Sequence, residues 1–282
     1  MVKQNLRNHV EALSVKIGER HLWKERSLSE AADYIESAFR ASGYAVKRQT
    51  YTCYGKEVSN LIAEGEGGKG KVVVIGAHYD TVPGTPGADD NASAVAGMLE
   101  LARLLRPHIN KRQFIFAAFV NEEPPCFGSE NMGSMVYARH LKERQVPVDV
   151  MISLEMIGCF SKEPIQKYPF PGMGFFYPKE CSFIGVAGNF SSSRYVSLIK
   201  KGIKRHSSMD ARSLTGPESL GGINLSDNYS FWHYGYRAVM VTDTAFYRNK
   251  NYHQETDTIE TLDFESMTEV VRGLYHTLLV DF

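Results

Sequence analysis

Three short apolar runs, separated by segments with helical spacing, constrain the fold of this chain most strongly. The runs cover residues 72–75, 113–120 and 148–154 and are rich in Val, Ile and Phe. Continuous apolar runs of this length are typical of strands that are buried on both faces of a sheet. The segments between them, 92–105 and 132–142, predict helices. This alternation indicates an α/β fold in which a mainly parallel central sheet is flanked by helices on both faces.

The rest of the chain extends this pattern at both ends. A capping box from Ser27 to Glu30 is expected to open a helix over 27–39, and Asn91 is expected to cap the helix over 92–105. Residues 159–181, in which Pro, Gly and aromatic residues alternate, predict a long irregular loop. No linker-like stretch divides the chain, so residues 1–282 are expected to form one domain. Further helices are predicted over 5–17, 193–204 and 265–279, and further strands over 46–54, 58–63, 182–186 and 238–242.

Charge and targeting signals exclude several classes of partner. Lys and Arg together number 32, as do Asp and Glu, so the charge gives no reason to expect nucleic acid or an anionic membrane as a partner. The first residues lack the apolar core of a signal peptide. As written, the chain is expected to be cytoplasmic, or secreted or periplasmic if its start was trimmed. The four cysteines form no CxxC pair and are expected to be buried free thiols.

Polar residues follow the predicted strands, where an open α/β sheet places its ligands. Four of the predicted strand ends, or the loops after them, contribute acidic or imidazole side chains. Imidazole and carboxylate groups together suit zinc, and also manganese or cobalt. The set comprises His78, Asp90, Glu122, Glu123, Glu155 and His253.

The charge of these residues bears on how many ions they would hold. Asp90, Glu123 and Glu155 carry three negative charges, so one divalent ion leaves the site negative, whereas two leave it with one positive charge. Two ions held together lower the pKa of a shared water and polarise a scissile carbonyl. The site therefore favours hydrolysis with two metal ions.

Five ordered segments carry a resemblance to a known family. They are His78-Tyr79-Asp80, the Gly-Ala-Asp-Asp-Asn of 87–91, the Asn-Glu-Glu of 121–123, the Leu-Glu-Met-Ile-Gly of 154–158, and Tyr252-His253. Together they resemble the motifs of the di-zinc aminopeptidases, the bacterial leucyl-type zinc exopeptidases, which are relatives of the glutaminyl cyclases. The resemblance extends from about residue 60 to residue 257 and implies the α/β/α sandwich of that family. Weaker similar segments lie at 226–228 and 242–247.

The resemblance implies a metal-binding role for five residues. His78 and Glu155 would hold one zinc ion, and Glu123 and His253 would hold the other. Asp90 would bridge the two ions, and its peptide bond to Asn91 would be cis. In most aminopeptidases of this type Asp stands where this chain has Glu155. The extra methylene moves the carboxylate by roughly one bond length, which puts the spacing and the preferred ion of that site in question.

Three further roles follow from the same resemblance. Asp80 would orient His78 through its second ring nitrogen. Glu122 would be the general base, and Tyr252 would donate a hydrogen bond to the developing oxyanion. Asp227 could serve as a supporting acid of the site or as an ordinary turn residue.

The implied function is an aminopeptidase that acts on peptides with a free N-terminal amine. The alternatives are a glutaminyl cyclase that uses one zinc ion and a non-catalytic binding domain, which is expected to have lost its ligands. The aromatic loop could be a wall of the substrate pocket or a packed surface loop. As a pocket wall, it predicts a preference for a large apolar first residue. Its candidate side chains are Phe170, Phe175, Phe176 and Tyr177.

Overall fold

The computed structural model describes residues 1–65, 70–108 and 112–282 and is built around one eight-stranded sheet. The strand order is β1-β2-β4-β3-β5-β8-β6-β7. The central neighbours β4, β3, β5 and β8 are parallel, whereas β1, β2 and β6 each pair antiparallel with a neighbour. The predicted α/β fold with a mainly parallel central sheet is confirmed. The strands are β1 Ala45–Cys53, β2 Lys56–Glu64, β3 Val72–His78, β4 Phe114–Phe119, β5 Val148–Glu155, β6 Phe183–Asn189, β7 Asp210–Gly216 and β8 Ala238–Thr242.

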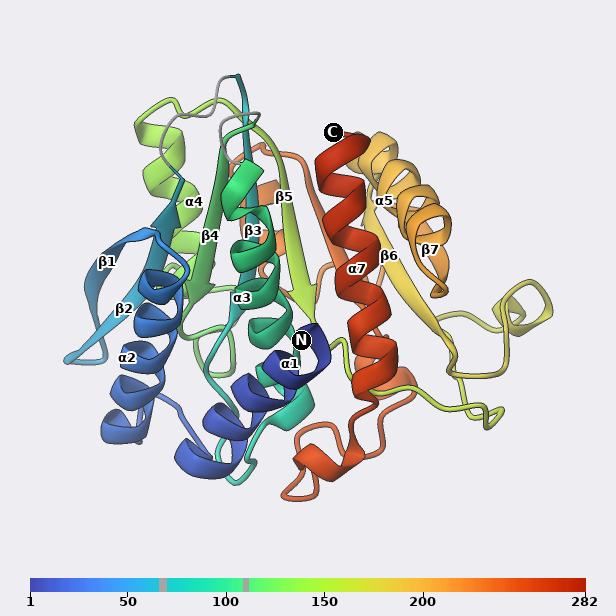
Figure 1. The fold of residues 1–282 in the computed structure, drawn as a ribbon, viewed down its shortest axis with the longest axis horizontal. Helices are drawn as coiled ribbons and strands as arrows, with labels where there is room; N and C mark the ends of the chain where they lie inside the picture. The colour runs from blue at the N-terminus through green and yellow to red at the C-terminus, as the bar shows by residue number, and fades with distance from the viewer. Residues whose placement is uncertain (66–69, 109–111) are drawn as a thin grey trace.

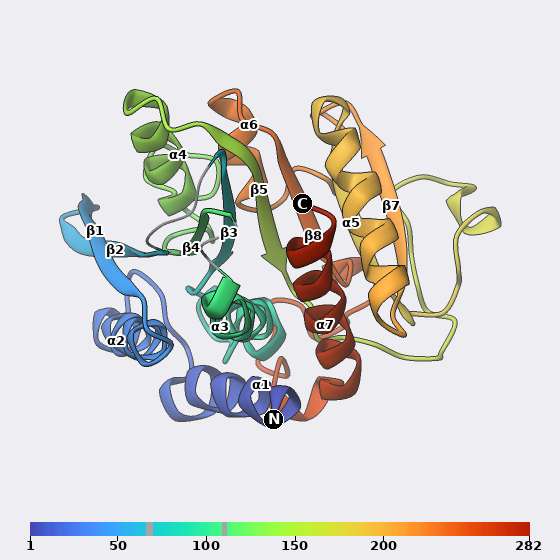
Figure 2. The same ribbon diagram turned by 45° about the horizontal axis from the view of Figure 1, so that its top comes forward.

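Helices cover both faces of this sheet (Figures 1 and 2). The front face in Figure 1 carries α2, α3, α5 and α7, while α4 and α6 lie behind, and α1 packs outside α3 and α7. A π-helical segment, Glu11–Ile17, continues α1 and ends at Gly18, which has a positive φ. The helices are α1 Val2–Val10, α2 Glu25–Ala41, α3 Ala94–Leu105, α4 Gly133–Glu143, α5 Ser193–His206, α6 Asn228–His233 and α7 Phe264–Val280.

The alternation of side chains along the central strands builds two cores. Val73 and Ile75 of β3 face the cluster under α3 and α7, whereas Val72 and Val74 face the cluster under α4 and α6. Because successive side chains of a strand point to opposite faces, a continuous apolar run fills both cores at once. This explains why the apolar runs predicted the central strands. Among the described residues, no helix combines the length and apolar character needed to cross a membrane.

Two local predictions about helix starts are wrong. Helix α2 begins at Glu25, so Ser27 lies inside it and its hydroxyl donates to the carbonyls of Glu19 and Lys24 rather than capping the helix. Helix α3 begins at Ala94, and Asn91 is not its cap. The Asn91 amide instead reaches β5, where it donates to the Leu154 carbonyl. Ser27 thus binds carbonyls that precede the helix, and Asn91 binds a partner distant in the sequence, so neither side chain caps a helix.

Two elements were not predicted at all. Strand β7 lies at the edge of the sheet and most of its residues are half-buried, so it lacks the apolar run of the central strands. Helix α6 has only six residues, which is too short for a helical repeat to show. The prediction of free thiols is confirmed: all four cysteines are unpaired, and only Cys159 is partly exposed.

Candidate metal centre

The order of the strands brings the predicted ligands to one edge of the sheet. His78 ends β3, which lies between β4 and β5. Glu122 and Glu123 follow β4, and Glu155 ends β5. These strands are parallel, so their carboxyl ends meet at the same edge, where open α/β sheets place their ligands. The loop after β8 adds His253, and the loop after β3 adds Asp90.

Asp90 lies between the two histidines. Its Oδ1 is 3.4 Å from Nε2 of His78, and its Oδ2 is 3.2 Å from Nε2 of His253. Glu155 Oε2 also lies 3.4 Å from Nε2 of His78, and Glu123 Oε1 lies 3.3 Å from Nε2 of His253. The site therefore contains two groups of three potential ligands that share Asp90. The peptide bond between Asp90 and Asn91 is cis, as the resemblance implies.

The polar atoms of this site lack the partners that buried groups require. Asp90 Oδ1 and His253 Nε2 are buried and form no hydrogen bond with the described residues. His78, Asp90, Glu123 and Glu155 are each less than a tenth exposed. Buried carboxylates and imidazoles without hydrogen bonds are costly unless they are paired or coordinate a metal. The residues present therefore fit divalent ions such as zinc.

Burial and mutual proximity shift the pKa values of the metal-free site. Burial and the charge of Asp90 raise the pKa of Glu123 to about 8. Burial also raises the pKa of Glu122 well above its usual value. The pKa of Asp90 is lowered despite its burial, because His253 and His78 contact its carboxylate. Burial lowers the pKa of His253, but contacts with Asp90 and Glu123 outweigh it and raise the value to about 10. In the absence of metal, protons on these groups reduce the repulsion between the acids.

Two buried aspartates hold the backbone segments that carry the ligands. Asp80 accepts the backbone amides of Glu122 and Glu123, each at 3.1 Å. Asp257 accepts the amides of Asp89 and Asp90, each at 3.0 Å. Each carboxylate thus fixes two successive residues, one of which is a predicted metal ligand.

Asp80 also lies beside the ring of His78. Its carboxylate Oδ1 lies 3.6 Å from Nδ1 of His78, which is too long for a hydrogen bond. The backbone carbonyl of Asp80 lies nearer, at 3.2 Å from the same nitrogen. The side chain of Asp80 therefore organises the loop after β4, and its role in orienting the imidazole stays a prediction.

Sequence reasoning missed three residues that support the ligands. Ser226 donates its hydroxyl to Oε2 of Glu155 at 2.7 Å. Asp257 fixes the Asp90 loop, and the side chain of Asn91 accepts the amide of Met156, just after Glu155. Asn91 and Ser226 lie in segments that carry the resemblance, but the contacts of all three residues were not predicted, because each acts on a segment more than sixty positions away. Asp227, for which the sequence allowed either a supporting role or an ordinary turn, is fully buried. Neither of its carboxylate oxygens accepts a hydrogen bond from the described residues.

A second group of acidic side chains lies next to the site, but its carboxylate oxygens already accept hydrogen bonds from the protein. Asp89, Cys159 and Asp243 come close enough together to hold an ion. However, Asp89 accepts the amide of Gly158 and the side-chain amide of Asn249. Asp243 accepts the amides of Cys159 and Ala245. These donors occupy the carboxylate oxygens, so the group braces the loops behind the metal centre.

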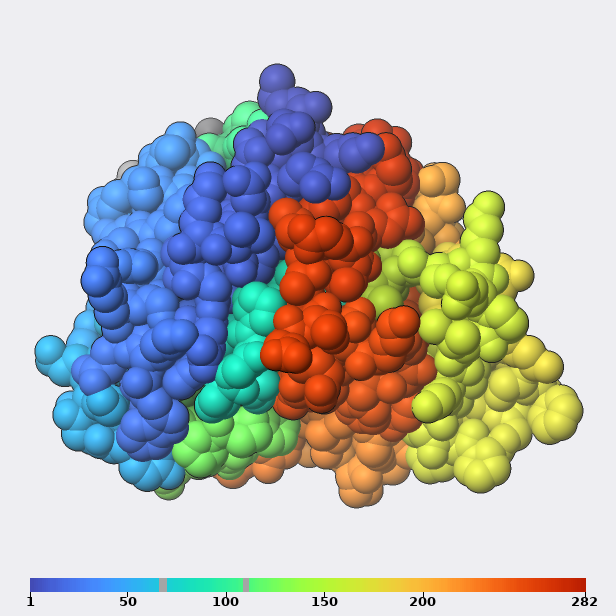
Figure 3. All heavy atoms as spheres, turned by 90° about the horizontal axis from the view of Figure 1, so that it is seen from below, coloured from blue at the N-terminus to red at the C-terminus, as the bar shows by residue number. Residues whose placement is uncertain are grey.

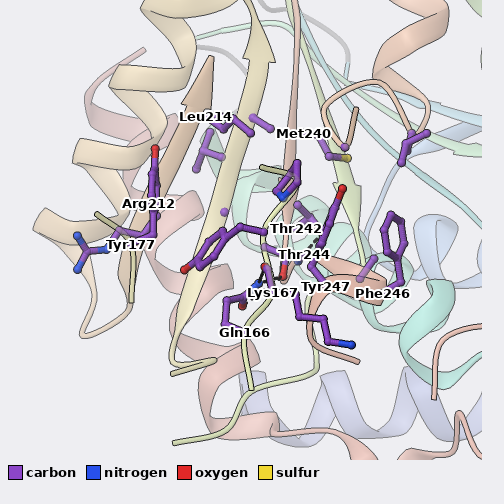
Figure 4. Close-up of a pocket in the computed structure, with 18 of the residues that line it drawn as sticks. Gln166, Lys167, Tyr177, Arg212, Leu214, Met240, Thr242, Thr244, Phe246 and Tyr247 are labelled. Atoms are coloured by element: carbon purple, nitrogen blue, oxygen red, sulfur yellow. Dashed lines mark hydrogen bonds between the residues drawn. The ribbon is translucent and has the colours of Figure 1, made fainter. Parts of the chain in front are cut away.

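A pocket of about 800 Å³, including its open mouth, adjoins the metal centre (Figure 4). Glu155 and Tyr252 lie on its wall at the metal side, and the Tyr252 ring stacks on His253 with 3.7 Å between the ring centres. Met240 and Leu214 contribute apolar surface deeper in the pocket. Figure 3 views the molecule from below, where the yellow-green 159–181 loop lies at one side of this face.

Of the four aromatic side chains of the 159–181 loop that were expected to line this pocket, only Tyr177 does so. Tyr177 lines it, as do Tyr168 and Met173 of the same loop. Phe170, Phe175 and Phe176 do not line it, and the last two are 90% and 85% exposed. Tyr177 is held in place because its hydroxyl donates to the Ser213 carbonyl of β7. The loop therefore forms part of the pocket wall, while its tip faces solvent.

The α/β fold and the paired groups of carboxylate and imidazole side chains indicate a metal-dependent enzyme. The model of peptidase family M28 matches residues 60–278, and the chain belongs to this family. It is 40% identical over 257 residues to the uncharacterized protein YfbL of Escherichia coli, covering 88% of this chain and 79% of that protein.

Solved structures share the fold at low sequence identity. The LapA aminopeptidase of Legionella pneumophila matches with a TM-score of 0.78 and 20% identity, over 99% of this chain and 70% of that one. A glutaminyl cyclase of Bacteroides thetaiotaomicron matches with a TM-score of 0.74 and 15% identity, over 99% of this chain and 97% of that one. The fold is therefore common to both activities.

Proposed function

We propose that this protein is an aminopeptidase that removes N-terminal residues from peptides with two zinc ions. The position of Asp90 between His78 and His253 carries this proposal, because a carboxylate with one oxygen toward each imidazole suits a bridging ligand. His78 and Glu155 complete one site, and Glu123 and His253 complete the other. Zinc bound there supplies a Lewis acid for the scissile carbonyl and lowers the pKa of water. We assign residues 1–282 to one catalytic domain.

Glu122 is assigned as the general base. It follows β4 beside Glu123, and its Oε2 lies 3.9 Å from Nε2 of His78. It belongs to neither of the two groups that share Asp90, although with His78 and Glu123 it forms a further group close enough to hold an ion. A carboxylate placed in this way takes a proton from the attacking water and returns it to the leaving amine.

Tyr252 is assigned as the donor to the developing oxyanion. It lines the pocket beside Glu155, and stacking on His253 fixes its ring. Burial holds the pKa of its hydroxyl far above the usual value, so it stays protonated and able to donate.

The lining of the pocket suits a substrate whose first residue has a large apolar side chain. Met240, Leu214, Tyr168 and Tyr177 are among its lining residues. At the metal end the carboxylates of the site favour a positively charged α-amine. The proposed substrate is therefore a peptide with a free N-terminus and a large apolar or aromatic first side chain.

A panel of aminoacyl reporter substrates, with and without an acetylated amine, tests the proposal together with zinc analysis. We expect two ions per chain and turnover of free-amine substrates only, with large apolar residues preferred. The variant His253→Ala should lose one ion, whereas His233→Ala, at an exposed histidine of α6, should keep both.

Equal turnover of acetylated substrates would contradict the exopeptidase assignment. The alternative is a glutaminyl cyclase, whose expected marks are one ion at saturating zinc and cyclisation of a peptide that begins with Gln. Two complete ligand groups in this chain favour the peptidase.

A further inference from the structure

Arg20 is a fully buried cation in the N-terminal segment, ahead of the part of the chain that the family model matches. It lies between Gly18 and α2, and all its hydrogen bonds go to backbone carbonyls. Among the described residues no carboxylate pairs with its guanidinium. The bonds run from Nε to Tyr79 at 2.7 Å, from Nη1 to Leu13 at 3.3 Å, Gly18 at 3.1 Å and Pro86 at 2.7 Å, and from Nη2 to Gly87 at 2.9 Å.

The contacts of Arg20 connect the two ends of the loop that joins His78 to Asp90. Tyr79 follows His78 directly, and Gly87 begins the turn that leads to Asp90. The backbone of Arg20 is tied to the same loop, since its carbonyl accepts the amide of Thr81 at 2.9 Å. Figure 3 shows the blue N-terminal segment beside the teal residues of this loop.

The loop is held from two sides by groups of opposite charge. Arg20 binds the carbonyls of Pro86 and Gly87, and Asp257 binds the amides of Asp89 and Asp90. Gly87 fits this arrangement because it has a φ of +59°, and a Cβ there would lie 2.3 Å from the carbonyl oxygen of Asp90. The position of Asp90 therefore depends on both anchors.

The charge of Arg20 also needs an explanation. A buried cation without a carboxylate partner is costly unless nearby charges compensate for it. Burial lowers the pKa of Arg20 to about 10, and the neighbouring Asp257, Asp80, Asp90 and Glu123 oppose this shift. The guanidinium thus stays charged at neutral pH and offsets part of the negative charge of the metal-free centre.

We propose that Arg20 is a positioning residue of the metal centre. It fixes the loop that carries Asp90 and offsets part of the negative charge of the proposed ligands. The proposal rests on the function proposed above. It makes the connection between Gly18 and α2 part of the site, because the anchor of the proposed shared ligand comes from this connection. A guanidinium is needed, because its planar donors reach several carbonyls at once, whereas a lysine ammonium is a single point charge.

Zinc titration of the metal-free protein by competition with a fluorescent chelator tests this role without measuring activity. Supporting residues of metal ligands usually change metal affinity by about 10- to 100-fold. We expect Arg20→Lys and Arg20→Ala to weaken zinc binding by about this factor, with the larger loss for Arg20→Ala. Added millimolar guanidinium should partly restore the affinity of Arg20→Ala, because the truncation leaves a cavity of the right shape.

Arg248 offers a matched control. It is also buried and donates to the carbonyls of Cys159, Cys181 and Phe183, at the base of the aromatic loop. Arg248→Lys should raise KM, because it loosens the loop that forms part of the pocket wall. The zinc affinity of this variant should stay within about twofold of the wild-type value.

The proposal is overturned if Arg20→Lys binds zinc as tightly as the wild type. It is also overturned if Arg20→Lys and the control Arg248→Lys weaken zinc binding equally. If Arg20→Ala does not fold, the zinc titration of Arg20→Lys alone tests the proposal. Failure of the proposed function has a different signature, since the wild-type protein itself would then bind no pair of ions.

Discussion

Glu122 and Glu123 are adjacent in the chain but have different neighbours. Glu123 reaches His253 at 3.3 Å, whereas Glu122 approaches His78 only to 3.9 Å. The amides of both residues bind Asp80, which fixes the backbone between them. Because the two side chains are held separately, their proposed roles as base and ligand can be tested independently.

Exchanging each glutamate for its amide separates these roles. Glu122→Gln should keep both ions and lower kcat by about 10²- to 10⁴-fold, the usual contribution of general base catalysis. Glu123→Gln should instead lose one ion. Zinc analysis and kinetics of the two variants provide the measurement. If Glu122→Gln lost zinc or kept normal turnover, the assignment of base and ligand would have to be reversed.

Glu155 allows a milder test at the same scale. Its Oε2 accepts a hydrogen bond from Ser226 and lies 3.4 Å from Nε2 of His78. Glu155→Asp shortens the ligand but keeps its charge, so we expect activity within about tenfold, or about 1.4 kcal/mol of barrier, and a change in the preferred metal. Metal analysis of Glu155→Asp, and its kcat with zinc, manganese and cobalt, measure the activity and the preferred metal. Loss of both ions would show that the longer side chain is essential.

The raised pKa of Glu123 predicts a pH dependence of metal binding. With a pKa of about 8, this carboxyl group is mostly protonated at pH 7 in the metal-free protein. A proton must leave Glu123 before its carboxylate can bind an ion, and His253, whose pKa is about 10, must also lose one, so zinc affinity should rise with pH from 7 up to about 10. Calorimetry in buffers of different ionisation enthalpy measures the protons released. No release at pH 7 would contradict the assignment of both Glu123 and His253 as ligands.

At the scale of elements, the 159–181 loop combines a fixed wall with an exposed tip. Arg248 ties both ends of the loop, since it donates to the carbonyls of Cys159 and Cys181. The hydrogen bond from Tyr177 to Ser213 attaches the loop to the edge strand β7. The tip, with Phe175 and Phe176, extends into solvent.

This arrangement predicts different effects for neighbouring aromatic residues. Tyr177→Ala should raise KM for substrates with a large apolar first residue by about tenfold, because it removes pocket surface worth roughly 1–3 kcal/mol. Phe176→Ala should leave KM unchanged, since Phe176 does not line this pocket. Steady-state kinetics with Leu and Ala reporters measures both. A larger effect of Phe176→Ala would mean that the tip closes over the substrate.

At the scale of the whole molecule, the metal centre joins segments that are far apart in the chain. Its ligands follow β3, β4, β5 and β8, and its supporting residues extend from Arg20 to Asp257. Ions that bind these segments together stabilise the folded state and have no preformed site in the unfolded chain.

Chelation should therefore lower the melting temperature as well as abolish activity. Zinc at one hundred times its Kd adds about 2.7 kcal/mol to the free energy of unfolding when it binds only the folded protein. Thermal unfolding with and without EDTA, followed by readdition of zinc, measures this difference. If the melting temperature did not change, the ions would not be linking these segments.

The amino-acid sequence by itself determined the central sheet and the candidate ligands that the fold brings together. Continuous apolar runs marked β3, β4 and β5, because strands buried on both faces need apolar residues at every position. The residues after those strands could be placed together, because parallel strands end at one edge. The helix start at Ser27 and the cap at Asn91 were wrong, because each polar side chain found a distant or competing partner.

Only the tertiary structure decided which residues support the ligands and which aromatic side chains line the pocket. Arg20, Ser226 and Asp257 act on backbone or side chains brought near by folding, and no spacing in the chain records those contacts. Likewise, Tyr177 and Phe176 are neighbours of similar chemistry, and only the hydrogen bond of Tyr177 to β7 separates a wall residue from an exposed one. Local patterns report burial and periodicity, whereas these roles depend on the distance between segments that the fold alone sets.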